Sequence, residues 1–400
     1  MWNDACGITE KFAFLKTLET FSAFIPPKKR KEPSFFIKKN SRNSIFRLRN
    51  TQNECKLLNQ IKTDHLYLEK CSVSISKRKI KVYFLGSGEF AVPYLDVLTN
   101  CTSVELVGVG TQPDRPFGRR RQLRPTPVGI YCGTRNINCE RIESVSSDEF
   151  YARMNGLQPD LLVVVSFGQI LRERILDFPR LGCLNVHSSL LPKYRGASPI
   201  TSMILGGDEI GGVTFMRMDV GLDTGPIYDV FETELGDHFT TQSLEKYLSE
   251  ESALMLPELI TRIAGGLEPC PQDHSKACVT KKIKKTDGSI VWGEDSATVL
   301  RKIRAYYPWP GSAFRIPSKG GFSLVKITEA RLAEGSGEPG RSLDLGKRWI
   351  IACGTGAIEI LKLIPEGSRE MNAADFLRGF GGKTGHLEIV LDGPPAAGTI

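Results

Sequence analysis

The sequence predicts an α/β protein in which a Rossmann-like, doubly wound sheet is followed by a small, OB-like β-barrel domain. Two observations predict the sheet. Short apolar runs alternate with helical stretches over residues 80–264, and each run is apolar throughout, as expected of parallel strands covered on both faces. A third observation predicts the second domain, because the segments beyond residue 280 are short and separated by Gly turns.

The expected strands follow the apolar runs. In the first part of the chain they are IKVYFLG, VELVGVG (104–110), DLLVVVSFG (160–168), GCLNVH (182–187) and GVTFMRMD (212–219). Helical spacing is found in AVPYLDVLTN and in residues 241–264. In the second part the expected strands are SIVWG, SAFRI, FSLVKITEARL, RWIIACG and AIEILKLIPEG, with helices near 295–306 and 372–378.

The chain has 400 residues, which is more than one typical domain needs. We expect a basic extension at 1–78, the doubly wound domain at 79–266, a linker at 267–280 and the β-barrel-like domain at 281–400. The linker is expected because GGLEPCPQDHSKACVT is rich in Gly, Pro and polar residues.

The composition excludes several classes of protein. With 40% hydrophobic and 24% charged residues, it is that of a soluble globular protein. No run approaches the roughly 18 apolar residues that a membrane span requires. The ten cysteines lack CxxC spacing, which favours reduced thiols over a disulfide framework. The five histidines show no ligand spacing, so we expect no metal site.

The net charge of +8 is unevenly distributed. Residues 1–81 carry 18 Lys and Arg against 7 Asp and Glu, residues 82–275 carry 16 against 25, and residues 276–400 carry 19 against 13. A basic C-terminal segment behind an acidic one suggests a polyanionic partner held by the basic segment.

Residues 1–78 allow three interpretations. They could form a transit peptide for a mitochondrion or plastid, although their seven acidic residues do not suit one. The KKRK cluster at 28–31 could serve nuclear localisation or nucleic-acid binding. The simplest interpretation is a poorly ordered extension without a role, or a start codon assigned too far upstream.

Asn185, His187 and Asp223 are the candidate catalytic residues. Asn185 and His187 lie two residues apart at the end of an apolar strand, so their side chains should share a face at the edge where α/β sheets bind ligands. Asp223 lies in GLDTG, a loop able to return toward the sheet. The plainer interpretations are a structural histidine and an ordinary Asx turn, and sequence spacing does not decide between them.

GSGEFA (86–91) fits the dinucleotide fingerprint and follows a strand. The acid that should end the second strand is missing, since Asp114 comes only after a Pro-containing loop. We therefore expect no nicotinamide or flavin, and interpret the glycines as a tight turn beside a ligand.

The motifs NVHSSLLPKYRGASPI and MDVGLDTG resemble those of the 10-formyltetrahydrofolate-dependent formyltransferase family. TQPDRPFGRRRQLRPTPV, VVVSFGQIL, YYPWPGS and MNAADFLRG are similar to the branch of that family that formylates methionyl-tRNA. The resemblance covers roughly residues 80–380. It implies a formyl transfer from 10-formyltetrahydrofolate to the α-amino group of initiator methionyl-tRNA, without a metal or nicotinamide.

The resemblance also assigns roles to residues. Asn185 and His187 would stabilise the oxyanion that forms when the amine attacks the formyl carbon, and Asp223 would orient His187 or relay a proton. The residues implied for folate binding are Ser188, Ser189, Leu190, Leu191, Pro192, Phe167, Gly168 and Ile170.

The loop RPFGRRRQLR holds five arginines in residues 115–124. A run of charges is usually a solvated face, but beside an active site an Arg-rich loop suits a phosphate backbone. The residues implied for tRNA binding are Arg115, Arg119, Arg120, Arg121, Arg124, Lys281, Lys282, Lys284 and Lys285. Of these, Arg119 best matches the family's acceptor-stem arginine.

Other functions with the same trio remain as alternatives. A formyltransferase for a nucleotide sugar, a glycinamide ribonucleotide formyltransferase and a formyltetrahydrofolate hydrolase would share it, but none needs the arginine-rich loop together with a basic C-terminal domain. A catalytically silent RNA-binding module would not need the trio. We expect a monomer in the cytoplasm, with an organelle as the alternative if residues 1–78 are a transit peptide.

Overall fold

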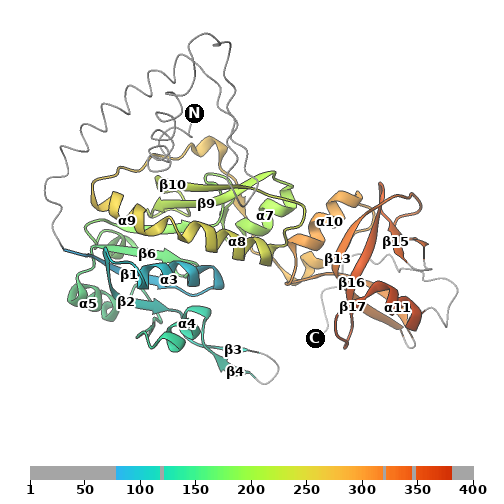
Figure 1. The fold of residues 1–400 in the computed structure, drawn as a ribbon, viewed down its shortest axis with the longest axis horizontal. Coiled ribbons are helices and arrows are strands. Elements are labelled where there is room, and N and C mark those ends of the chain that lie inside the picture. Colours follow the sequence, from blue (N-terminus) through green and yellow to red (C-terminus); the bar gives the residue numbers. More distant parts are fainter. Residues whose placement is uncertain (1–77, 118–120, 319–320, 345–347, 381–400) are drawn as a thin grey trace, which may run out of the picture. The chain divides into compact units, whose positions relative to one another are not determined.

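The computed structural model describes residues 78–117, 121–318, 321–344 and 348–380 (Figure 1). The extension predicted for 1–78 lies outside the described residues except for Arg78, and so do the predicted tRNA contacts Arg119 and Arg120.

The first domain is built on a seven-stranded sheet with the order β10-β9-β7-β6-β1-β2-β5. The five neighbouring strands β7, β6, β1, β2 and β5 are parallel to one another. At the other end of the sheet, β9 runs antiparallel to β7, and β10 runs antiparallel to β9. The five predicted strands are all present, and β10 and β5 were not predicted. The strands are β1 (Ile80–Gly86), β2 (Val104–Thr111), β5 (Glu140–Arg141), β6 (Leu161–Val165), β7 (Cys183–His187), β9 (Ile210–Arg217) and β10 (Ile227–Glu234).

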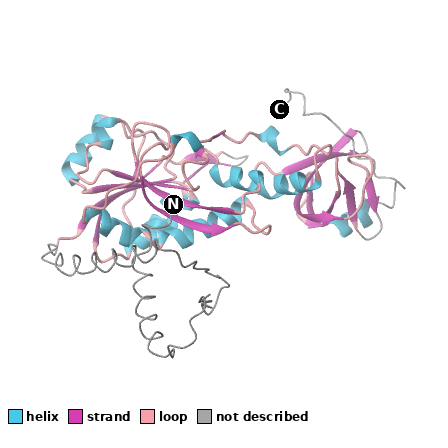
Figure 2. Cartoon of the chain, turned by 90° about the horizontal axis from the view of Figure 1, so that it is seen from above, coloured by secondary structure: helices cyan, strands magenta, loops and turns pink. Residues whose placement is uncertain are grey.

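Helices lie on both sides of this sheet, as Figure 2 shows. Alternate residues of β1 enter separate cores: Val82 and Phe84 pack in one hydrophobic cluster, and Tyr83 and Leu85 in another. Continuous apolar runs are what such two-sided burial requires. The helices are η1 (Glu89–Ala91), α3 (Val92–Thr99), α4 (Pro127–Arg135), α5 (Asp148–Leu157), α6 (Glu173–Leu176), α7 (Pro199–Gly206), α8 (Thr241–Ala253) and α9 (Leu256–Ala264).

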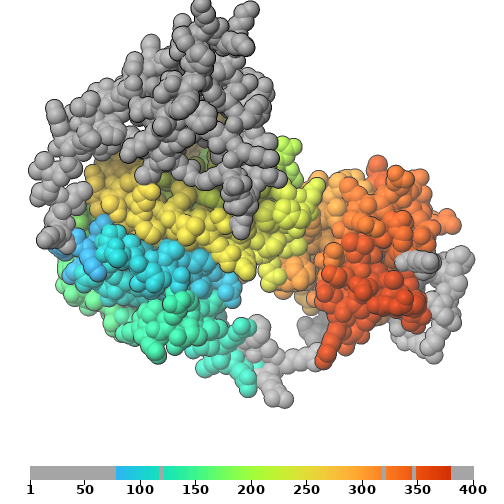
Figure 3. Space-filling view, viewed as in Figure 1, coloured from blue at the N-terminus to red at the C-terminus, as the bar shows by residue number. Residues whose placement is uncertain are grey.

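The helical stretch predicted at 241–264 is two helices, α8 and α9. Thr240 and Ser243 form a capping box at the start of α8, and Pro257 lies in the first turn of α9. Proline has no N–H and its ring clashes with a preceding helical turn, so a helix is kinked or interrupted there, whereas the first turn of a new helix accepts it. Both helices contact α3, and Figure 3 shows them (yellow) beside it (blue) at the surface.

The second domain is a six-stranded antiparallel sheet with a hydrophobic core of its own. Its order is β12-β13-β16-β15-β14, with β17 alongside β16. Its elements are α10 (Ser296–Ala305), β12 (Ser312–Ser318), β13 (Gly321–Ala333), β14 (Ser342–Asp344), β15 (Trp349–Ala352), β16 (Ala357–Pro365), β17 (Met371–Asn372) and α11 (Ala373–Phe380).

One predicted strand of this domain is wrong. SIVWG forms no strand: Ser289 makes a single β-bridge to Ala313. Ile290 and Trp292 of the segment pack in the core instead, where the Trp292 ring meets Phe314 edge to face, while Val291 is exposed. A short apolar run does not reveal whether it joins a sheet or only packs against one.

Two small pairings complete the structure. β3 (Arg115–Phe117) and β4 (Gln122–Arg124) form an antiparallel hairpin, and β8 (Arg195–Gly196) pairs in parallel with β11 (Val279–Thr280). Short 3₁₀ helices flank β11: η2 (His274–Lys276) and η3 (Lys285–Gly288). Among the described residues, no helix is long and apolar enough to cross a membrane.

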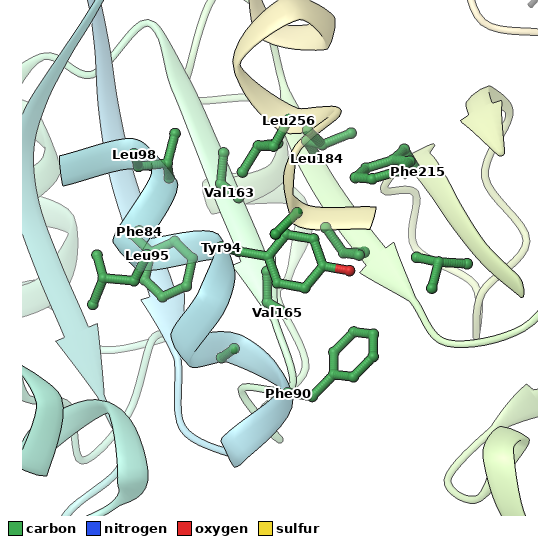
Figure 4. Close-up of a cluster of buried hydrophobic side chains, with 14 of the residues drawn as sticks. Phe84, Phe90, Tyr94, Leu95, Leu98, Val163, Val165, Leu184, Phe215 and Leu256 are labelled. Carbon is green, nitrogen blue, oxygen red and sulfur yellow. The ribbon is translucent and has the colours of Figure 1, made fainter. Parts of the chain in front are cut away.

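A substitution at Phe215 of β9 tests how much the hydrophobic core contributes to the stability of the strands that carry the site. Its side chain is 0% exposed and its ring lies edge-on to Tyr94 at 6.4 Å between centroids (Figure 4). We expect Phe215→Ala to lower the free energy of unfolding by about 3–5 kcal/mol, because a large cavity remains. Phe322→Ala, at a position 54% exposed, should change it by less than about 1 kcal/mol. Equal losses in urea denaturation would contradict this assignment.

Candidate active site

The three central parallel strands end at the same edge of the sheet. Gly86 of β1 pairs with Val165 of β6, and Val165 pairs with Val186 of β7. His187, the last residue of β7, therefore lies at the carboxyl edge, where doubly wound sheets bind ligands.

Asn185 and His187 share one face of β7. Leu184 and Val186 belong to the hydrophobic cluster on one side of the sheet, and Cys183 belongs to the cluster on the other. Side chains alternate along a strand, so Asn185 and His187 are on the same side as Cys183. Asn185 is half-buried and His187 is 7% exposed, which leaves the amide more accessible than the imidazole.

His187 is held by two groups. Its Nε2 is 2.9 Å from the Tyr194 carbonyl oxygen, and its Nδ1 is 3.6 Å from Oδ2 of Asp223. A carbonyl oxygen only accepts hydrogen bonds, so Nε2 carries a hydrogen. Nδ1 faces a carboxylate, and a second proton there would complete an ion pair with Asp223.

Asp223 reaches His187 from the opposite edge of the sheet. Because β9 is antiparallel to β7, its last residue, Arg217, pairs with Leu184 near the start of β7. The loop at 218–226 begins there and returns toward the carboxyl edge, since it brings Asp223 to His187. The return that the sequence suggested for this loop is observed.

The backbone of this loop is tightly constrained at Asp223 and Gly225. Asp223 has φ = 52°, in the left-handed region that few residues with a side chain adopt. A Cβ atom at Gly225 would lie 1.8 Å from the Arg217 carbonyl oxygen, so only glycine fits. Oδ2 of Asp223 also accepts a hydrogen bond of 2.8 Å from the Gly196 N–H.

The segment after β7 rests on Thr214 of β9. The Thr214 hydroxyl donates to the Ser189 carbonyl oxygen at 2.7 Å and accepts from the Leu191 N–H at 3.0 Å. Thr214 is fully buried, and so is Ser189, whose own hydroxyl donates to the Lys193 carbonyl oxygen. The main chain of residues 188–193 is therefore held in place by hydrogen bonds to the hydroxyl groups of Thr214 and Ser189.

The residues assigned to folate binding divide into buried and accessible ones. Phe167, Ser189 and Leu191 are buried, so their side chains support the loops. Ile170 is 82% exposed and offers apolar surface close to Gly168, which has φ = 82°. The remaining members are half-buried or exposed: Ser188, Leu190, Pro192 and Gly168. Their roles stay predictions.

The arginine-rich loop is a hairpin that places like charges opposite each other. Arg115 pairs with Arg124 across β3 and β4, and both residues are exposed, as is Arg121. Like charges directly opposite each other in a sheet are destabilising, a cost that an anion bound between them would offset. The Arg115 guanidinium donates to Gln112, whose amide donates to the Phe167 carbonyl oxygen at 2.6 Å.

The second basic group follows β11. Its four lysines are all exposed: Lys281, Lys282, Lys284 and Lys285. β11 pairs with β8, the short strand that follows the segment after His187. The four lysines come directly after β11 in the chain, so they begin close to the site. The sequence placed them at the start of a separate domain and did not indicate this proximity.

Thiol chemistry finds little support at this site. Burial raises the pKa of the Cys183 thiol to about 12, so this neighbour of Asn185 stays protonated and is a poor nucleophile. In the described part of the chain no group of three or more His, Cys, Asp or Glu residues could hold a metal ion.

The sequence did not reveal the residues that support the two loops of the site by hydrogen bonds. Thr214 supports the segment after His187, and Arg195 and Gln272 are buried beside the Asp223 loop. Their partners are 23 or more positions away along the chain. Of these three residues only Thr214 left a signal in the sequence, as a polar residue between the apolar residues of its strand.

Comparison with known proteins gives consistent matches. The family described as Formyl transferase matches residues 78–260, and the one described as Formyl transferase, C-terminal domain matches residues 282–381. Methionyl-tRNA formyltransferase of Citrifermentans bemidjiense is 41% identical over 303 residues, which are 75% of this chain and 94% of that protein. The enzyme of the same name from Geotalea daltonii is 40% identical over 315 residues, 77% of this chain and 99% of that protein.

A solved structure agrees at the level of the fold. HypX from Aquifex aeolicus, in complex with tetrahydrofolic acid, superposes with a TM-score of 0.53 at 18% identity, over 77% of this chain and 48% of that one. The doubly wound sheet and both family matches define a formyl transferase. Within that class, the chain belongs to the methionyl-tRNA formyltransferase family.

Thr214 provides a test of how the site is supported. Thr214→Val keeps the shape but leaves the Ser189 carbonyl and the Leu191 N–H buried without their partner. We expect the free energy of unfolding to fall by about 1–3 kcal/mol. Thr214→Ser retains the hydroxyl and should cost about 0.8 kcal/mol, the value of one buried methylene. Equal losses for the two variants in chemical denaturation would show that the hydroxyl does not matter.

Proposed function

We propose that this chain transfers the formyl group of 10-formyltetrahydrofolate to the α-amino group of initiator methionyl-tRNA, giving N-formylmethionyl-tRNA. The observation that carries the proposal is the 41% identity that extends over 94% of a methionyl-tRNA formyltransferase. A match of that length includes both the domain with the candidate trio and the basic C-terminal domain.

Asn185 and His187 would act on the formyl oxygen. When the amine attacks the formyl carbon, negative charge develops on that oxygen, and the Asn185 amide is a hydrogen-bond donor available to it. A proton taken up by His187 would add a positive charge close by, which would stabilise the developing anion. The new C–N bond forms as the bond from the formyl carbon to N10 of the folate breaks. The amine loses one proton in this exchange, and N10 gains one.

Asp223 would keep the histidine in the right form. Its carboxylate faces Nδ1 at 3.6 Å, while Nε2 is occupied by the Tyr194 carbonyl. A proton taken from the attacking amine can be held at Nδ1, where the carboxylate stabilises it. Asp223 thereby orients the imidazole and need not be protonated itself.

The accessible residues near the trio suit a folate. Exposed Ile170 supplies apolar surface for a flat ring, and Gly168 leaves the main chain approachable. The main-chain groups of residues 188–192 are held in place by Thr214 and could recognise the polar edge of the ring.

The two basic groups would hold the tRNA. The hairpin arginines are exposed near the segment after β6, to which Gln112 connects them, and the four lysines follow β11. Guanidinium and ammonium groups in such clusters neutralise phosphates and make binding depend on salt. Arg119 and Arg120, outside the described residues, belong to the same loop. We further propose a cytoplasmic monomer, with a mitochondrial or plastid location as the alternative if residues 1–78 direct import.

The reaction can be tested directly with labelled donor. Purified chain is incubated with 10-formyltetrahydrofolate carrying a labelled formyl group and with charged, uncharged or no initiator tRNA. We expect label on methionine only with methionyl-tRNA, and His187→Ala should reduce the rate by at least about 10²-fold. His238→Ala, at an exposed histidine, should retain the rate. Formate released equally without tRNA would identify a hydrolase instead.

The hairpin has its own test. In Arg115→Ala and Arg124→Ala we expect a higher KM for methionyl-tRNA, and a salt dependence of binding that is shallower by about one unit per variant. The KM for the formyl donor should stay the same. Arg135→Ala, which removes an exposed arginine paired with Asp96, serves as the control. A change in donor affinity alone would exclude the hairpin from tRNA binding.

A further inference from the structure

The segment at 270–280 is bonded to both loops of the site, although its composition is that of a linker. Cys270 exchanges two main-chain hydrogen bonds with Ile227, just after the Asp223 loop. β11, at the other end of the segment, pairs with β8, and the Thr280 hydroxyl bonds the main chain at Arg195 and Ser198. The segment thus spans from one catalytic loop to the other.

Gln272 is the central contact of this segment. Its side chain is 6% exposed, and its Nε2 donates to the carbonyl oxygens of Asp223 at 2.9 Å and Gly225 at 2.7 Å. Its Oε1 accepts a hydrogen bond of 2.6 Å from the Arg195 guanidinium. Two acceptors on one side and a donor on the other fix which end of the amide faces the loop, because only the NH₂ group can donate.

One carbonyl that Gln272 binds belongs to Asp223 itself, and the other belongs to Gly225, two residues further along the loop. The left-handed conformation is unfavourable for a residue with a side chain, so neighbouring contacts must hold Asp223 in it. Gln272 provides that support on the main chain, and the Gly196 N–H holds the carboxylate. The position of Oδ2 relative to His187 depends on both.

Arg195 completes the arrangement. It is buried, and the same Nη2 that donates to Gln272 lies 3.0 Å from Nδ1 of His274. Within the described residues Arg195 forms no ion pair with a carboxylate, and its guanidinium donates to the Gln272 side-chain oxygen. Its main chain belongs to β8, which places it between His187 and the linker.

We propose that Gln272 is a positioning residue for formyl transfer, which acts through Asp223 by holding its main chain in the conformation that aligns the carboxylate with His187. The inference rests on the proposed catalytic role of Asp223. It makes the segment between the two domains a part of the active site.

The kinetic test uses two substitutions in the full chain. Gln272→Leu removes all three hydrogen bonds, and Gln272→Glu keeps an acceptor for Arg195 while losing the donors to Asp223 and Gly225. A displacement of about 1 Å at a catalytic group can cost about 10²-fold in rate. We expect kcat to fall by about 10–100-fold in both variants, with the KM values for donor and methionyl-tRNA changed less than about 2-fold. Normal kcat in Gln272→Glu would overturn the proposal.

A double-mutant cycle separates positioning from a general loss of stability. In the Asp223→Asn background, adding Gln272→Leu should lower kcat by less than about 3-fold, because the residue acts through Asp223. The same loss in both backgrounds would overturn the proposal. Ser275→Ala, an exposed position in the same segment, is the matched control and should leave kcat unchanged.

Hydrogen–deuterium exchange gives a readout that does not depend on activity. Gln272→Leu should speed exchange in the peptide covering 218–226 while β1 and β6 keep wild-type protection. Unchanged exchange in that peptide would overturn the inference even if the enzyme lost activity. A wild-type chain that fails to formylate methionyl-tRNA would reject the proposed function alone, since this exchange experiment would still decide whether Gln272 holds the loop.

Discussion

The reversed direction of β9 beside β7 is the constraint on which the site depends. A parallel β9 would end at the carboxyl edge and begin its next loop there. Because β9 is antiparallel, its loop starts at the far edge and must return to reach His187. That route requires a left-handed residue at Asp223 and a glycine at 225, and it leaves carbonyl groups that need donors from elsewhere in the chain.

Hydrogen bonds from buried polar side chains hold the loops of the site in place. Thr214 supports one loop and Gln272 the other, and both side chains are buried. In such surroundings a hydrogen bond is strong and a missing partner is costly, so the geometry is well determined. The basic side chains of the hairpin and the lysines after β11 are exposed, where water and salt can reach them. The chemistry and the recognition of a polyanion thus occupy different electrostatic environments.

The sequence predicted the fold class and the central strands because burial on both faces leaves an unbroken apolar run, as in β6. Strand β10 escaped prediction because its exposed face and charged residues interrupt that pattern. SIVWG was misread because Ile290 and Trp292 pack in the core without joining the sheet.

For the site, the period of two was enough to place Asn185 and His187 on one face. Neither Thr214 nor Gln272 could be found in this way, since hydrogen bonds between residues far apart in the chain leave no local pattern. The distance between Asp223 and His187 is likewise a product of tertiary structure. The roles assigned to the folate and tRNA residues came from resemblance and not from spacing.

The pairing of β11 with β8 limits how this enzyme could be divided or recombined. A catalytic domain cut after residue 266 would lose the partner strand of β8, the acceptor of the Arg195 guanidinium and both donors to the Asp223 loop. An exchange of C-terminal domains between relatives would therefore have to keep residues 270–280 with the domain that holds His187. In evolutionary terms, the junction at which this architecture can accept a new partner domain lies after β11, at the C-terminal end of the predicted linker and not at its start.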